Sequence, residues 1–378
     1  MSMKPEAQAQ IRRFFDGTLL PDEVMEAMTG DCGWFPSRTV APGSHTTSFE
    51  SAGLSLENLR VEDHGRSFDL YDYLSVNRVA GLMVLKDGRR VVETYSLGID
   101  ARTMWNSCSL AKSVSSTLVG VAAGEGLIDL DAPVTRYADV GGIYKDVSVR
   151  QLLRMASGIR WRETYEDPTS ERRQLLDIQI EWRKRGILDF MESLPAETPP
   201  GKSWKYNTGE SYVVSAVLEG ATGMNMADYL QSRLWSRLGM EAEARLWTES
   251  VGGMAISGSG MFATLRDYAR FGQFVLGGGR VGGLDLLPES WVAEAGAPFE
   301  IDGTIVPYGY MWWIPVLDDP ELKGSFQAEG IYGQFIHINP RRRLVAVVLS
   351  ARSKPGYTKR FEINDDAFFA ALARALPD

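Results

Sequence analysis

The 378-residue chain has only two cysteines, Cys32 and Cys108, and three histidines, His45, His64 and His337. Two cysteines do not make a disulfide framework, and we expect Cys108 to be a small packing residue. The histidines are widely separated and lack the spacing of zinc ligands, so we expect no metal and no cofactor. With so few histidines and no G-x-S-x-G motif, a Ser-His-Asp triad is not favoured.

The chain also lacks any apolar run near the roughly 20 residues that a membrane helix needs. Its first residues have neither the apolar core nor the cleavage site of a secretory peptide, so we expect a cytoplasmic protein. The net charge of -9 argues against nucleic acid or an anionic membrane as partner. We expect a small-molecule substrate as the partner and leave a homodimer open.

One short motif, Ser109-Leu-Ala-Lys112, combines a hydroxyl and an amine. A spacing of three residues puts both side chains on one face of a helix. A serine needs an adjacent base to become a nucleophile, and a lysine can serve if burial lowers its pKa. Lys112 lies in an apolar stretch, where a charge needs a reason. The four residues alone, however, fit an N-cap serine with a solvated lysine better.

The order of predicted elements indicates one antiparallel sheet built from both ends of the chain. Residues 79–85 and 90–95 read as a hairpin with an Asp87-Gly88 turn. Helical patterns fill the middle, and a closing helix is expected over 365–376. Three further stretches have the apolar pattern of strands, the last of them central: 310–315, 332–339 and 344–350.

This order predicts three parts of the chain. Residues 1–60 are expected to be an irregular segment that wraps the main body. Residues 61–120 and 255–378 are expected to form the α/β sheet domain, with helices flanking the sheet. Residues 121–254 are expected to form a mainly helical domain inserted between them.

Three separated motifs occur in an order that resembles a known superfamily. They are Ser109-Leu-Ala-Lys112, the run Trp204-Lys-Tyr206-Asn-Thr208, and Ala328-Glu329-Gly330-Ile331, which leads into a strand. Over roughly residues 75 to 350 the set resembles the serine β-lactamases and penicillin-binding proteins. Within that superfamily it is similar to the class C-like esterases and amidases, and most of all to the 6-aminohexanoate-dimer hydrolases.

The resemblance implies an α/β (α+β) fold of the β-lactamase/transpeptidase type and a serine hydrolase that cleaves carboxylic esters or linear amides. It implies an acyl-enzyme on Ser109, with Lys112 and Tyr206 sharing the role of general base. Either Lys112 keeps the pKa of Tyr206 low, or Lys112 takes the proton itself. The oxyanion hole is expected from the backbone N–H groups of Ser109 and Ile331. An acyltransferase with the same acyl-enzyme, or a non-catalytic binding protein of this fold, remains an alternative.

Four further residues are candidates for contact with substrate: Tyr165, Thr208, Glu329 and Gly330. Tyr165 resembles a loop tyrosine that touches substrate in the relatives, and equally fits a partly buried loop aromatic. Thr208 stands where the family has asparagine, and lacks the geometry of an amide. Glu329 stands in the element that carries the family's lysine. As an anion it would disfavour β-lactams and favour a substrate with a cationic end.

Overall fold

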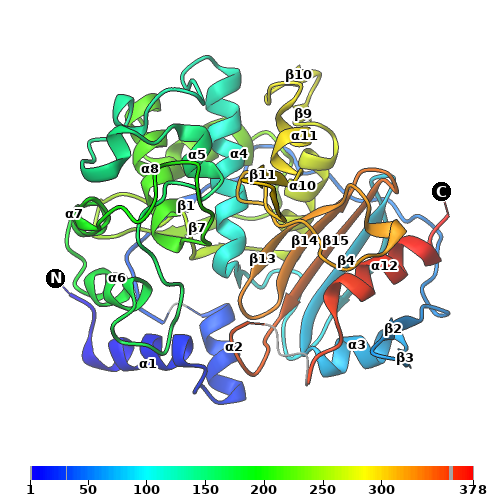
Figure 1. Ribbon diagram of the computed structural model, residues 1–378. Helices are drawn as coiled ribbons and strands as arrows, with labels where there is room; N and C mark the ends of the chain where they lie inside the picture. Colours follow the sequence, from blue (N-terminus) through cyan, green and yellow to red (C-terminus); the bar gives the residue numbers. More distant parts are fainter. Residues whose placement is uncertain (1, 31, 357–360, 378) are drawn as a thin grey trace.

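A five-stranded antiparallel sheet forms one half of the molecule (Figure 1). The computed structural model describes residues 2–30, 32–356 and 361–377. The sheet has the order β13-β14-β15-β4-β5, so strands from both ends of the sequence meet at its centre. Their bounds are β4 Val79–Lys86, β5 Arg89–Tyr95, β13 Phe326–Gly330, β14 Gln334–Asn339 and β15 Leu344–Ser350. The expected antiparallel sheet, hairpin and central strand are confirmed.

Strand β15 shows why the sheet is buried on both faces. Its residues alternate between two cores, because successive side chains of a strand point to opposite faces. Val347 and Leu349 pack on the side of helix α10, Leu265–Leu276. Val348 packs on the other side, which is covered by α3, Leu70–Val76, and by α12, Asp365–Ala375. Helix α12 crosses in front of the strands in Figure 1.

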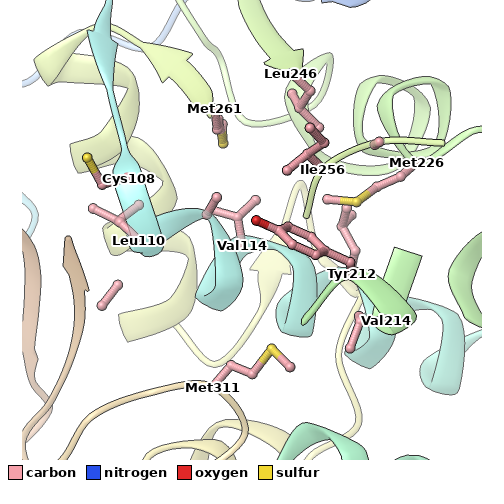
Figure 2. Close-up of a cluster of buried hydrophobic side chains, with 14 of the residues drawn as sticks. Cys108, Leu110, Val114, Tyr212, Val214, Met226, Leu246, Ile256, Met261 and Met311 are labelled. Atoms are coloured by element: carbon pink, nitrogen blue, oxygen red, sulfur yellow. The ribbon is translucent and has the colours of Figure 1, made fainter. Parts of the chain in front are cut away.

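The other half is mainly helical, and helix α4 runs between the two halves (Figure 1). It is buried on nearly all sides, and Figure 2 shows Val114 beside Tyr212. Among the described helices, none is both long and apolar enough to span a bilayer. The helices of this half are α4 Ala111–Gly124, α5 Val149–Leu153, α6 Glu171–Ile180, α7 Gly186–Ser193, α8 Thr208–Thr222 and α9 Met226–Leu230, which continues as a π-helical turn over Gln231–Trp235.

The prediction that residues 1–60 are irregular is wrong. The segment contains α1, Pro5–Asp16, and α2, Pro21–Thr29, each with proline in its first turn, where the missing N–H has no cost. Strand β1, Ser37–Val40, pairs with β7, Ala244–Trp247, in a second sheet of order β1-β7-β8-β6. The segment does pack on the main body, because Phe14 and Trp34 belong to the large core.

Residues 310–315 do not form the expected strand. Met311 has a φ of 58°, a left-handed conformation that interrupts an extended chain. Trp313 makes only isolated bridges, to Tyr308 and Gln327, and the edge strand is β13. The remaining elements are short: β2 Val61–Asp63, β3 Arg66–Phe68, β6 Trp105–Asn106, β8 Met261–Ala263, β9 Arg280–Val281, β10 Leu284–Asp285, α11 Trp291–Ala295, β11 Phe299–Ile301 and β12 Thr304–Val306.

We predict that Leu349→Ala lowers the free energy of unfolding by about 2–5 kcal/mol, because it leaves a cavity in the core beneath the sheet. Leu349 is fully buried, whereas Leu284 in the β9–β10 hairpin is 58% exposed. Leu284→Ala is therefore the control, expected to stay within about 0.5 kcal/mol of the parent. Urea unfolding measures both, and equal losses would contradict this account of the core.

Candidate active site

A strained turn presents Ser109 at the start of helix α4. The turn Cys108–Leu110 has 3-10 geometry, and the α-helix begins at Ala111. Cys108 has a φ of 46°, a left-handed conformation that is costly for a residue other than glycine. Its N–H is held by Asn106 Oδ1 at 3.0 Å. Cys108 and Leu110 are buried, while Ser109 is only partly so and lines a cavity.

Lys112 lies one helical turn after Ser109, as the spacing predicts. Its Nζ is 2.9 Å from Ser109 Oγ and 2.8 Å from the carbonyl oxygen of Gly258. A Cβ at position 258 would lie 2.1 Å from Ser211 Oγ, so only glycine allows this approach. Lys112 is 1% exposed, and burial, aided by the charge of Arg172, lowers its pKa to about 7. A large fraction of this amine is therefore neutral at neutral pH.

Tyr206 is the residue before the N-cap of α8, and its side chain extends to the pair of Ser109 and Lys112. Its ring stacks on Trp313 at 5.1 Å, and Lys112 Nζ lies 5.2 Å from the ring centroid. Burial and the charge of Glu163 raise the pKa of Tyr206 well above its usual value, while its hydrogen bond with Ser109 acts the other way. Tyr206 is thus a neutral phenol in the free protein. The raised pKa does not agree with the expectation that Lys112 keeps the pKa of Tyr206 low. It agrees with the other expectation, in which Lys112 itself takes the proton.

The end of β13 lies against the Ser109 turn. A Cβ at Gly330 would meet Ser107 O at 2.7 Å, so glycine permits the close contact. The next residue, Ile331, lines the same cavity as Ser109. Glu329 also lines it, but burial, with the charge of Asp366 beyond it, raises its pKa to about 8. Glu329 is therefore mostly protonated at neutral pH, and the repulsive charge expected there is largely absent.

Two cavities meet at Ser109 and Ile331. The larger has a volume of about 650 Å³ and is lined by Tyr206, Glu329 and Gly330 among others. The smaller has a volume of about 20 Å³ and is lined on one side by Tyr165 and Thr208. The four predicted contact residues thus divide between the two. No group of three or more His, Cys, Asp or Glu residues suited to a metal occurs in the described part of the chain.

Glu163 is a partly buried carboxylate that the sequence did not single out. Its Oε1 accepts hydrogen bonds from Thr208 Oγ1 at 2.5 Å and from Tyr165 at 3.0 Å. Its Oε2 accepts from Trp161 Nε1 at 2.6 Å and from the Thr208 N–H at 3.0 Å. Thr208 and Tyr165 are therefore held in place by one side chain. Its nearness to Tyr165 in the sequence was the one available signal, and a glutamate in a polar loop is too common to interpret.

The antiparallel sheet, the helical half and the cluster of serine, lysine and tyrosine between them define a β-lactamase/transpeptidase-like fold. The Beta-lactamase family model matches residues 76–367, more than half of the chain. The chain belongs to this family.

The chain is similar to three proteins of known sequence or structure. The 6-aminohexanoate-dimer hydrolase of Paenarthrobacter ureafaciens is 28% identical over 329 residues, which cover 82% of this chain and 81% of that protein. A structure described as "Putative 6-aminohexanoate-dimer hydrolase from Bacillus anthracis" has a TM-score of 0.79 and 25% identity, and covers 93% of this chain and 94% of its own. A family VIII carboxylesterase has a TM-score of 0.58 and 18% identity, with 81% and 95% covered, and shows the shared fold.

We predict that Glu163→Gln lowers the free energy of unfolding by about 1–3 kcal/mol, because an amide nitrogen cannot accept the hydrogen bonds now made to one carboxylate oxygen. Glu166→Gln is the matched control, since Glu166 is exposed in the same loop. Denaturant unfolding of both variants measures the difference. A Glu163 variant as stable as the Glu166 variant would show that the four hydrogen bonds contribute little.

Proposed function

We propose that this protein is a serine hydrolase that cleaves carboxylic esters or linear amides through an acyl-enzyme on Ser109. The observation that carries the proposal is the distance of 2.9 Å between Ser109 Oγ and a buried amine whose pKa is about 7. A serine needs such a base to attack a carbonyl carbon. The names of the relatives, which include an amide-dimer hydrolase and a carboxylesterase, support the same substrate class.

In the acylation step Ser109 Oγ forms a bond to the carbonyl carbon while neutral Lys112 takes its proton. The bond from that carbon to the leaving oxygen or nitrogen then breaks. Tyr206, a neutral phenol, gives its proton to the leaving group and regains one from Lys112. In deacylation, water gives a proton to Lys112 and its oxygen forms a bond to the acyl carbon. The bond from that carbon to Ser109 Oγ then breaks, and Lys112 returns the proton to Oγ. Protons and charge balance without a cofactor.

The negative charge that develops on the carbonyl oxygen needs donors. We assign these to the backbone N–H groups of Ser109 and Ile331, which the close contact at Gly330 brings to one cavity. One such donor is typically worth about 3 kcal/mol of barrier.

The larger cavity is the leaving-group side, because Tyr206 lines it and does not line the smaller one. Its far wall carries Glu62, Asp63 and Asp366, while Arg352 on that wall is paired with Asp365 at 2.6 Å. The carboxylates that line this cavity outnumber its one arginine, so the wall has a net negative charge. We therefore expect neutral or cationic leaving groups to be preferred over anionic ones.

We predict that Ser109→Ala abolishes turnover of a short-chain 4-nitrophenyl ester and also the mass adduct formed by a fluorophosphonate probe. The reason is that no acyl-enzyme can form without the hydroxyl. Ser44→Ala, at an exposed position in the N-terminal segment, is the control and should retain both. Full activity in the Ser109 variant would mean that another nucleophile is used.

We predict that the acid limb of kcat/KM against pH has an apparent pKa near 7. Below that pH Lys112 is protonated and cannot accept the serine proton, so activity falls as pH falls. Lys112→Ala and Tyr206→Phe should each lower kcat/KM by on the order of 100-fold. Lys202→Ala, at an exposed residue, is the control. Parent rates in either site variant, or a flat profile between pH 6 and 8, would remove the assigned role.

A further inference from the structure

The smaller cavity beside Ser109 is lined by aromatic side chains and one cation. Phe14, Phe15 and Trp34 from the N-terminal segment line it, together with Tyr165 and Arg172. The cation is Arg172, which is 2% exposed. Its guanidinium carbon lies 4.5 Å from the centroid of the Phe15 ring and 5.4 Å from that of Tyr165. A built site, and not a surface charge, therefore faces this cavity.

Two donors of Arg172 have no acceptor in the described chain, while the side chain also has a hydrogen bond with Tyr165 and an ion pair with Glu163. Its Nε and Nη1 are buried and have no hydrogen-bond partner. The nearest carboxylate, on Glu163, is 3.7 Å from Nε, too far for a hydrogen bond. That carboxylate already accepts four hydrogen bonds from Trp161, Tyr165 and Thr208. A buried cation with idle donors is costly unless a ligand or water supplies the acceptor.

The charge of Arg172 also acts on one of the reacting groups. Its positive charge is one of the causes that lower the pKa of Lys112. Ser109 and Ile331 line the small cavity as well as the large one, so an acyl group bound to Ser109 can extend into either. Tyr206 lines only the large cavity, so the leaving group that it protonates departs on that side. The acyl group then occupies the small cavity.

We propose that the small cavity is the acyl pocket and that Arg172 binds a carboxylate at the far end of a short acyl chain. The preferred substrates are then monoesters or monoamides of short dicarboxylic acids. The cavity volume of about 20 Å³ holds only one or two water-sized groups, so the carboxylate is separated from the acyl carbon by a single methylene, as in malonate. The inference rests on the proposed function, since it assumes an acyl-enzyme on Ser109.

The test compares monophenyl malonate with phenyl propanoate, which have three-carbon acyl groups and the same leaving group. Released phenol is measured by chromatography, and the Ser109→Ala protein gives the background rate. We expect kcat/KM about 10-fold or more in favour of the malonate, the size of a charge-assisted hydrogen bond. In Arg172→Met the ratio of the two values should fall to about 1 or below. The ratio cancels any loss that affects both esters.

Arg160→Met is the matched control, because Arg160 is half-exposed, pairs with Glu171 and lines neither cavity. It should keep the parent ratio. If Arg172→Met does not fold, as circular dichroism would show, the ratio of the parent protein alone decides. A parent ratio near 1 means that water occupies the site and overturns the inference, while the hydrolase proposal stands. If neither ester is cleaved above background, both proposals fail.

Discussion

The site depends on the burial of one amine. Helix α4 is enclosed by both halves of the molecule, so Lys112 is 1% exposed, with Ser109 Oγ and the Gly258 carbonyl as its hydrogen-bond partners. Removing an ammonium group from water disfavours its charged form, which is why its pKa is about 7. The packing that makes α4 a core helix is thus the same feature that makes Lys112 a base.

Two opposite charges, Glu163 in the loop before α6 and Arg172 in α6, adjust this balance. Arg172 lowers the pKa of Lys112, whereas Glu163 raises the pKa of both Lys112 and Tyr206. The anion therefore keeps Tyr206 a proton donor, and the cation offsets the same anion at Lys112. Burial is the larger cause of both pKa shifts, and these two charges modify it. Because Glu163 also holds Thr208 and Tyr165, the loop links the electrostatics of the site to the shape of the small cavity.

The sequence was informative where the chemistry is local. The Ser109–Lys112 spacing and the alternation along residues 344–350 each lie within one element, and both the spacing and the central strand agree with the structure. Tyr206 and Ile331 came from the family resemblance alone, since their approach to Ser109 depends on tertiary packing. Glu163 was missed because its two hydrogen bonds with Thr208 join residues that are far apart in the sequence. The charge state of Glu329 was misjudged because burial, which raises its pKa to about 8, is not visible in a residue type.

The N-terminal segment contributes side chains to the wall of the small cavity. The family match begins at residue 76, so α1 and α2 lie outside it, yet Phe14, Phe15 and Trp34 line the small cavity. Ser109, Lys112 and Tyr206 all lie within the matched region. The groups assigned to bond making and proton transfer therefore belong to the shared fold, while part of the wall assigned to the acyl group comes from outside it. Changes in α1 can alter which acyl groups fit without displacing the buried amine, because Lys112 is held by Ser109 Oγ and the Gly258 carbonyl and not by the N-terminal segment.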